Sequence, residues 1–288
     1  MHNKLFIKNL ICLTLICSML FLFSGCRPQQ ETKVSPMSIT LLKVGKADAI
    51  VVLSGKHALL IDTGEEDDGE EVLGFLQQND IVNVDSMIIT HFDQDHVGGA
   101  DTILENINVK DIYLPDYEGT HTEYTDFMTA VKNSSSSVHR LNAPVSFSFK
   151  DAQILIDPPS SYEIDDPDSD YDNNFSLITT IIHGKNRLVF TGDAEKARIR
   201  EWIKSENATK CDFLKVPHHG IYNTALKELF EKLDPEISVI CSSKKNPANT
   251  KTLDLLHSYC PQIYETKDGN VLIISNGEKL ECSQQTKH

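Results

Sequence analysis

The sequence predicts a single α/β (α+β) domain in which helices cover the outer faces of two packed β-sheets. Short β-rich runs alternate with amphipathic helical segments along almost the whole chain, and hairpin-like strand pairs stand at both ends. Helices on the outer faces of two stacked sheets satisfy this order. The 288 residues are 40% hydrophobic, which is enough for a substantial core. We find neither a repeat nor an internal linker, so one domain is expected from about residue 37 to 284.

The first 25 residues are typical of an export signal rather than of this domain. Lys4 and Lys8 precede an apolar run from Leu10 to Phe23, as in a secretory signal peptide. The alternative is an uncleaved anchor helix, although the run is shorter than the roughly 20 apolar residues that span a bilayer. Both interpretations put the domain outside the cytoplasm.

A cysteine directly after the apolar run predicts a lipid anchor. Small residues precede it in Ser24-Gly25-Cys26, which resembles the lipobox of bacterial lipoproteins, where the peptide is cut before the cysteine and lipid is attached to it. We therefore expect a lipidated Cys26, a polar tether over residues 26–36, and a domain held on the extracytoplasmic face of a bacterial membrane. Residues 285–288 are expected to form a short tail.

The elements of the domain follow from their periodicity, taken in order. Three strands are expected in ITLLKV, AIVVLS and HALLID, with turns at Gly45 and Gly55. A helix with Val72, Phe75 and Leu76 on one face follows, then a short strand over 86–90, then a helix after Gly98-Gly99. Later strands are expected at 152–157, 176–182, 187–191, 213–216, 236–241 and 270–274, with helices near 122–132, 194–204, 225–233 and 250–258.

The charge of the chain restricts its partners. The formal net charge is -15, and removal of residues 1–25 leaves 25 bases against 42 acids. Because affinity for phosphate backbones comes largely from Lys and Arg, extended nucleic acid is an unlikely partner. A local cation, including a metal, still allows a small anion to bind. The sequence indicates no protein partner.

The strongest chemical motif is His91-Phe92-Asp93-Gln94-Asp95-His96, which directly follows a predicted strand. It brings four good metal ligands within six residues. Burying so many imidazoles and carboxylates unpaired would cost on the order of several kcal/mol per group, whereas a divalent cation compensates them. A metal site is therefore favoured over a solvated acidic loop.

Two further motifs also follow predicted strands. In Thr191-Gly192-Asp193 the carboxylate stands where a strand ends, as a metal ligand or as the cap of a following helix. Pro217-His218-His219-Gly220 places two adjacent imidazoles after another buried strand, which is unusual for packing alone. We expect metal-binding or acid–base roles for His218 and His219.

Together these motifs resemble the metallo-β-lactamase superfamily, and more narrowly the hydrolase domain of the competence protein ComEC and its free-standing relatives. The resemblance extends to both ends of the domain, through Val44-Gly45 with Asp48, Leu60-Ile61-Asp62-Thr63-Gly64, Asn173-Asn174-Phe175-Ser176-Leu177 and Thr266 with Gly269. It implies a four-layer αββα sandwich with the active site where the motif-bearing strands end. The chain departs from the pattern at Lys46 and at Ile221, where relatives usually have other residues.

The resemblance implies a site for one or two divalent cations. Its ligands would be His91 and Asp93 for one cation, and Asp95, His96 and one of His218 and His219 for the other, with Asp193 bridging. Typical members have His at the position of Asp93 and another His before Asp193; here Asn173 or Asn174 is the expected substitute, rather than His121, His139 or His183. Zinc is the expected metal, with manganese or magnesium favoured by the additional oxygen ligands.

These features predict a metal-dependent hydrolase. A cation in such a cluster lowers the pKa of the water it binds from about 16 to about 7, so the attacking group would be a metal-bound hydroxide. Asp95 and the His218–His219 pair are the expected catalytic residues, and the histidine that does not bind metal would protonate a leaving group or stabilise charge. The leading prediction is an extracytoplasmic phosphodiesterase or nuclease-like enzyme acting on a small or cell-wall phosphodiester.

Two other functions remain open at this point. One is hydrolysis of a lactone or β-lactam, in which the attack is on carbon. The other is a non-catalytic metal-binding lipoprotein.

Overall fold

The computed structural model describes residues 34–163 and 171–285. The predicted signal peptide, Cys26 and most of the predicted tether lie outside these ranges, as do residues 286–288 of the predicted tail. Among the helices within the ranges, none combines the length and the apolar character needed to cross a membrane.

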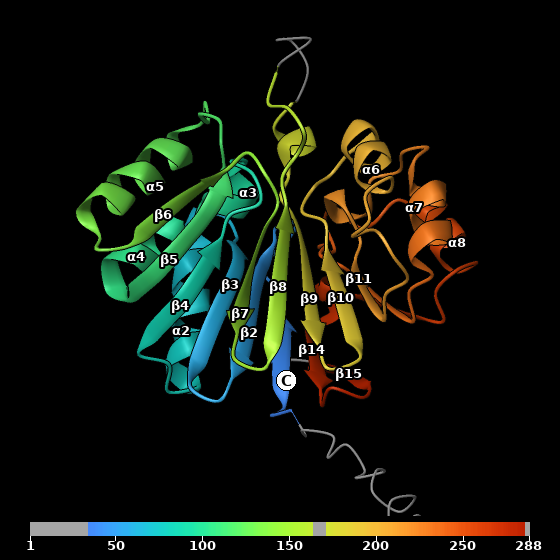
Figure 1. The fold of residues 1–288 in the computed structure, drawn as a ribbon, viewed down its shortest axis with the longest axis horizontal. Helices are drawn as coiled ribbons and strands as arrows, with labels where there is room; N and C mark the ends of the chain where they lie inside the picture. The colour runs from blue at the N-terminus through green and yellow to red at the C-terminus, as the bar shows by residue number, and fades with distance from the viewer. Residues whose placement is uncertain (1–33, 164–170, 286–288) are drawn as a thin grey trace, which may run out of the picture. The chain divides into compact units, whose positions relative to one another are not determined.

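The first sheet has eight strands in the order β15-β14-β1-β2-β3-β4-β5-β6 (Figure 1). Its first half is antiparallel, whereas β3, β4, β5 and β6 run parallel to one another. The strands are β1 (Met37–Leu41), β2 (Ala49–Ser54), β3 (His57–Thr63), β4 (Asn83–Ile88), β5 (Asn108–Pro115), β6 (Ser137–Leu141), β14 (Asn270–Ser275) and β15 (Leu280–Gln285).

The second sheet has seven strands in the order β13-β12-β11-β10-β9-β8-β7. Here β7 to β10 form antiparallel pairs, and β10 to β13 are parallel. The strands are β7 (Val145–Phe149), β8 (Ala152–Asp157), β9 (Ile178–His183), β10 (Asn186–Phe190), β11 (Phe213–Lys215), β12 (Ile237–Ile240) and β13 (Gln262–Glu265).

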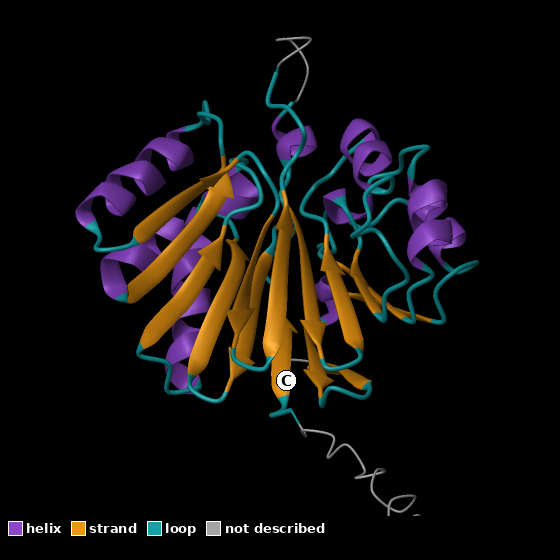
Figure 2. Ribbon diagram, in the orientation of Figure 1, coloured by secondary structure: helices purple, strands orange, loops and turns teal. Residues whose placement is uncertain are grey.

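The helices form two groups, one beside each sheet (Figure 2). The first group is α2 (Gly69–Gln78), α3 (Gln94–Val97), α4 (Ala100–Asn106) and α5 (Thr122–Asn133), and the second is α6 (Lys196–Trp202), α7 (Leu226–Leu233) and α8 (Thr250–Leu256). Single 3₁₀ turns complete the chain at η1 (Glu66–Asp68), η2 (Asp172–Phe175), η3 (His218–Gly220) and η4 (Thr266–Asp268).

Three separate apolar clusters hold these layers together. In β3, Leu59 and Ile61 face the cluster between the sheets, whereas Leu60 faces the cluster under α2, α4 and α5. In β10, Phe190 faces the space between the sheets and Val189 the cluster under α6, α7 and α8. Because alternate side chains of a strand point to opposite faces, each sheet is covered on both sides. The predicted four-layer αββα sandwich is confirmed.

Five strands were not predicted: β5, β6, β7, β13 and β15. Four of them are the edge strands of the two sheets. All the strands and helices that were predicted are present, and their ends differ from the predicted ones by up to a few residues.

The parallel strands determine where the functional loops lie. Parallel neighbours end at the same edge of a sheet, so the loops after β3 and β4 emerge together, as do the loops after β10, β11 and β12. The three motifs that carry the predicted metal ligands lie on the loops after β4, β10 and β11.

Candidate metal centre

The loop that carries the first motif is held by close contact with the loop after β3. His91 to Asp93 leave β4 and α3 begins at Gln94, while Gly98 and Gly99 press against the segment from Thr63 to Gly69. A Cβ on Gly99 would lie 2.6 Å from the carbonyl oxygen of Thr63. Only glycine therefore allows the short helix that carries Asp95 and His96 to lie this close to the end of β3.

Three segments meet around the carboxylate of Asp193. His96 Nε2 lies 3.3 Å from Asp193 Oδ1, and His219 Nε2 lies 3.0 Å from Asp193 Oδ2. Asp95 Oδ2 is 3.3 Å from the same nitrogen of His219. His91 lies beside His96, with ring centroids 4.1 Å apart. The loops after β4, β10 and β11 thus converge on one buried point.

The buried imidazoles are oriented by hydrogen bonds at Nδ1. The partner is the hydroxyl of Thr90 for His91 at 3.0 Å, the carboxylate of Asp62 for His96 at 2.8 Å, and the carbonyl of Cys241 for His219 at 3.0 Å. In all three rings Nε2 is buried and makes no hydrogen bond within the described residues. This is the arrangement that a second hydrogen-bonding shell imposes on metal-binding histidines, with Nδ1 engaged and the Nε2 lone pair available.

The buried carboxylates around Asp193 require positive charge beside them. Burial raises the pKa of Asp193, but His219, His96 and Lys215 outweigh it and hold that pKa well below its usual range. Burial likewise lowers the pKa of His96 and of His219, but Asp193 and its neighbours raise both above the usual value. Without another cation, the carboxylates would draw protons onto these imidazoles. A divalent cation satisfies the same demand, so the residues fit a metal ion.

A buried ion pair lies behind the cluster. Lys215, which has no exposed side-chain surface, pairs with Asp48 and lies 3.3 Å from Asp193 Oδ1. Its ammonium also donates to the carbonyl of Gly192 at 2.8 Å. Burial lowers the pKa of Lys215, but Asp48 and Asp193 raise it by more, so it stays charged. Lys215 therefore contacts the same oxygen of Asp193 as His96 does and helps to hold that carboxylate in place.

The adjacent histidines occupy different positions. His219 is buried in the cluster, whereas the side chain of His218 is 14% exposed, with Nε2 4.0 Å from Asp193 Oδ2. His218 Nδ1 lies 3.2 Å from Glu195 Oε1. Both histidines have left-handed backbone, with φ values of 48° and 50°. Such strain in residues other than glycine is concentrated at functional sites.

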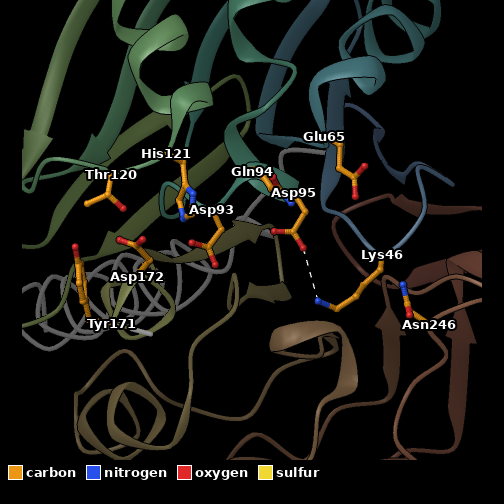
Figure 3. A pocket seen from close by; sticks show the side chains of 10 residues that line it. All are labelled: Lys46, Glu65, Asp93, Gln94, Asp95, Thr120, His121, Tyr171, Asp172 and Asn246. Carbon is orange, nitrogen blue, oxygen red and sulfur yellow. Dashed lines mark ion pairs between the residues drawn. The ribbon is translucent and has the colours of Figure 1, made fainter. Parts of the chain in front are cut away.

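An open cleft of about 650 Å³ leads to the centre (Figure 3). Lys46 lines one side, with Nζ 3.8 Å from Asp95 Oδ2. Asp93, His121 and Asp172 line another part, and in Figure 3 their side chains lie next to one another. Asp93 also approaches His91, with 3.5 Å between Oδ2 and Nε2. Acidic side chains thus predominate among the charged groups of the cleft.

All seven residues predicted as ligands lie at this site. A compact group of potential ligands comprises His96, Asp193 and His219 with Asp48, whose ligand atoms lie within 4.8 Å of one another. The alternative role of Asp193 as a helix cap is excluded, because the residue before α6 is Glu195.

Several residues that matter at the site were missed as ligands or partners. Lys215 was detectable in the sequence as a lysine inside an apolar strand, and Asp62 only through the family resemblance. Neither Asp172 nor His121 was predicted as a ligand, because Asn173 or Asn174 was the expected substitute for the missing histidine. His139 and His183 do lie elsewhere, bonded to Asp111 and Ser275.

The two asparagines offered as substitutes for a missing histidine differ. Asn174 Oδ1 accepts from the backbone N–H of Arg198 at 3.1 Å and is engaged at the start of α6. Asn173 is buried, and its Oδ1 makes no hydrogen bond within the described residues. Asn173 is thus the asparagine whose amide oxygen could act as a metal ligand.

Comparison with known proteins agrees with this geometry. Residues 42–244 match the family model described as the metallo-beta-lactamase superfamily. The chain is 25% identical over 291 residues to ComE operon protein 3 of Bacillus subtilis and 26% identical over 279 residues to Recombination protein 2 of Haemophilus influenzae, with 94% of this chain covered in each case. It spans 36% and 32% of those proteins, about a third of their length.

A solved structure supports the fold. The metallo-beta-lactamase fold protein YhfI from Bacillus subtilis superposes with a TM-score of 0.53 at 11% identity, covering 86% of this chain and all of that one. The predicted resemblance to ComEC-like proteins is confirmed by the sequence relatives, and the fold by this structure. The chain therefore belongs to the metallo-beta-lactamase superfamily and is a metal-dependent hydrolase of that family.

Proposed function

We propose that this protein is an extracytoplasmic phosphodiesterase that acts on a small or cell-wall-linked phosphodiester. The observation that carries the proposal is a buried ligand cluster with a partly exposed histidine, His218, beside it and a lysine, Lys46, in the cleft that leads to it. Together these supply a cation, a proton donor and a partner for an anionic substrate.

In this proposal Asp95, His96, Asp193 and His219 hold a divalent cation, with His91 and Asp93 beside them. When bound, such a cation would activate water and withdraw charge from the ester under attack. His218 is the acid that protonates the leaving oxygen, since its Nε2 lies near the cluster while its Nδ1 faces Glu195 at 3.2 Å. Glu195 orients the ring.

Lys46 would pair with a non-bridging oxygen of the substrate. Its ammonium lies 3.8 Å from Asp95 Oδ2, and its side chain is 31% exposed, so it can turn toward a ligand in the cleft. The hydroxyl that relatives usually have at the position of Ile221 is absent, and Lys46 would replace its contribution to phosphate binding.

The cleft favours a small substrate over a long polyanion. Its volume of about 650 Å³ lies within the range of small-molecule sites, roughly 300–1,000 Å³. Glu65, Asp93, Asp95 and Asp172 line it, and they would repel an extended phosphate backbone. The formal net charge of -15 would also repel an extended phosphate backbone.

The identity of the metal and the cellular location of the protein are also proposed. The imidazoles of His96 and His219 favour zinc, whereas the surrounding carboxylates also suit manganese or magnesium. Export and lipid attachment at Cys26 rest on the signal-like run and the lipobox-like residues. Labelling of cells with a tagged fatty acid should mark the wild-type chain but not Cys26→Ser.

The activity is tested with bis-p-nitrophenyl phosphate and the full-length chain in detergent, after chelation and after addition of Zn²⁺ or Mn²⁺. We expect cleavage that requires metal and that Asp95→Ala abolishes. A β-lactam reporter and a lactone are assayed in parallel. Turnover of either one, with the diester intact, would replace the proposal by carbon-centred hydrolysis; bound metal with no turnover of any substrate would favour a binding role.

A further inference from the structure

Three side chains from separate segments of the chain face one another at the mouth of the cleft. Asp93 lies on the loop after β4, His121 directly precedes α5, and Asp172 begins η2. One ligand atom from each of the three lies within 4.8 Å of the other two. Figure 3 shows the imidazole of His121 above the two carboxylates, all in the same part of the cleft.

Asp172 gives independent evidence that this group is built for a ligand. The residue is only 5% exposed, and its Oδ1 has no hydrogen-bond partner within the described residues. Its carboxylate is held by the hydroxyl of Tyr117, and the residue lines the cleft. A buried carboxylate oxygen without a partner is costly, and buried polar groups are normally satisfied by protein, water or an ion.

His121 has no competing structural task. It occupies the position before the first turn of α5, yet its side chain caps no backbone N–H of that helix. The residue is exposed to the cleft, so its ring nitrogens are accessible. It lies outside all the motifs that carry the family resemblance.

The group is distinct from the buried cluster. None of its members belongs to the set Asp48, His96, Asp193 and His219. Asp93 stands between the two, because its carboxylate approaches His91 at 3.5 Å on the inner side and has His121 and Asp172 on the outer side. A cation at the mouth would thus be a neighbour of the buried centre, with Asp93 as the side chain between them and with His121 and Asp172 as ligands of its own.

We propose that Asp93, His121 and Asp172 form a second cation site, open to the cleft. Two carboxylates and one imidazole, with the remaining positions facing solvent, suit a hard divalent ion such as Mn²⁺ that keeps some of its water. Because this site is more exposed than the buried cluster, it binds its ion more weakly. Cation binding at this site does not depend on which ester the enzyme hydrolyses.

The test is a titration of the metal-free, full-length chain in detergent with Mn²⁺, in which electron paramagnetic resonance counts the free ion. For the wild type we expect a tighter and a weaker class of bound ion. His121→Ala should weaken the weaker class at least tenfold and leave the tighter one unchanged. His139→Ala is the matched control, since His139 is a partly exposed histidine bonded to Asp111 away from the cleft, and it should change neither class.

Two further variants test which residues belong to which class of bound ion. Asp172→Asn should weaken the same class as His121→Ala, and circular dichroism checks that the variant is folded. His219→Ala should remove the tighter class and retain the weaker one. The proposal is overturned if His121→Ala binds both ions as the wild type does, or if His219→Ala loses both together. Because binding is measured directly, absence of phosphodiesterase turnover leaves this result unaffected.

Discussion

The two adjacent histidines of η3 have the same residue type but different surroundings. His219 is enclosed by Asp95, Asp193 and the carbonyl of Cys241, whereas His218 is partly exposed and lies beside Glu195. A ring held by a backbone carbonyl at one nitrogen presents the other to a metal. A ring beside a carboxylate at the rim is instead suited to deliver a proton.

Substitution should separate these roles. We expect His219→Asn to weaken metal binding at least tenfold. His218→Asn should leave metal content unchanged and lower kcat about 10²-fold or more, the usual contribution of a general acid. Metal per chain is measured by mass spectrometry beside turnover of the diester. Loss of metal in His218→Asn, or unaltered kcat, would contradict this division.

The charge of Lys215 has a structural consequence. Its ammonium is wholly buried against Asp48, Asp193 and the carbonyl of Gly192. Lys215→Met keeps much of the volume but leaves two buried carboxylates without their cation, so the free energy of unfolding should fall by about 3–5 kcal/mol. Urea denaturation of the metal-free protein measures this.

Lys210→Met is the matched control for this substitution. Lys210 pairs with Asp234 at 2.7 Å, but both side chains are more than half exposed. Exposed pairs contribute about 0–1 kcal/mol. A loss for Lys215→Met as small as that for Lys210→Met would mean that the buried pair does not hold the site together.

At the scale of elements, central strands were predictable and edge strands were not. The strand β2 (AIVVLS) is buried at every position, whereas β15 (LECSQQ) alternates between half-buried and exposed residues. An edge strand has fewer neighbours and often carries polar residues that prevent pairing with other chains. Its sequence therefore resembles a loop, and β6, β13 and β15 were missed for this reason, whereas β7 (VSFSF) has the alternation of a half-buried strand and was overlooked.

The contact between the two loops at Gly99 gives a prediction for an element. Gly99 has ordinary backbone angles, φ -80° and ψ 0°, so alanine there meets a purely steric conflict with Thr63 and Gly69. Gly99→Ala should lower the free energy of unfolding by about 1–3 kcal/mol, as overpacking does. It should also weaken metal binding, because α3 with His96 must shift.

Gly74→Ala serves as the control for Gly99→Ala. Gly74 lies within α2, and nothing stands within 4 Å of an added Cβ. Alanine should stabilise this helix by about 0.5–1 kcal/mol without altering metal binding. Thermal unfolding of both variants is the measurement; stabilisation by Gly99→Ala would show that the close approach is not required.

At the scale of the whole molecule, the site joins the two halves of the sandwich. His96 follows a strand of the first sheet, and Asp193 and His219 follow strands of the second. A cation bound by all three therefore links both sheets, and only the folded chain brings its ligands together.

Removal of metal should accordingly destabilise the entire fold. A ligand that binds only the native state adds about 2.7 kcal/mol when its free concentration is 100 times Kd. We expect the Tm to fall on chelation and to rise again with added Zn²⁺ or Mn²⁺. Asp193→Asn should show little dependence on metal. A wild-type Tm that is indifferent to chelator, with metal demonstrably removed, would contradict this link between the sheets.

The sequence by itself determined the fold class, the central strands and the ligand-bearing loops, because these depend on local periodicity and on residue type. Only the tertiary structure decided which histidine of the pair enters the cluster, that Lys215 pairs with Asp48, and that His121 meets Asp93 and Asp172. Each of these contacts joins segments distant in the chain. Local sequence specifies what a side chain is, whereas its neighbours across the site are specified by how the two sheets and their loops pack.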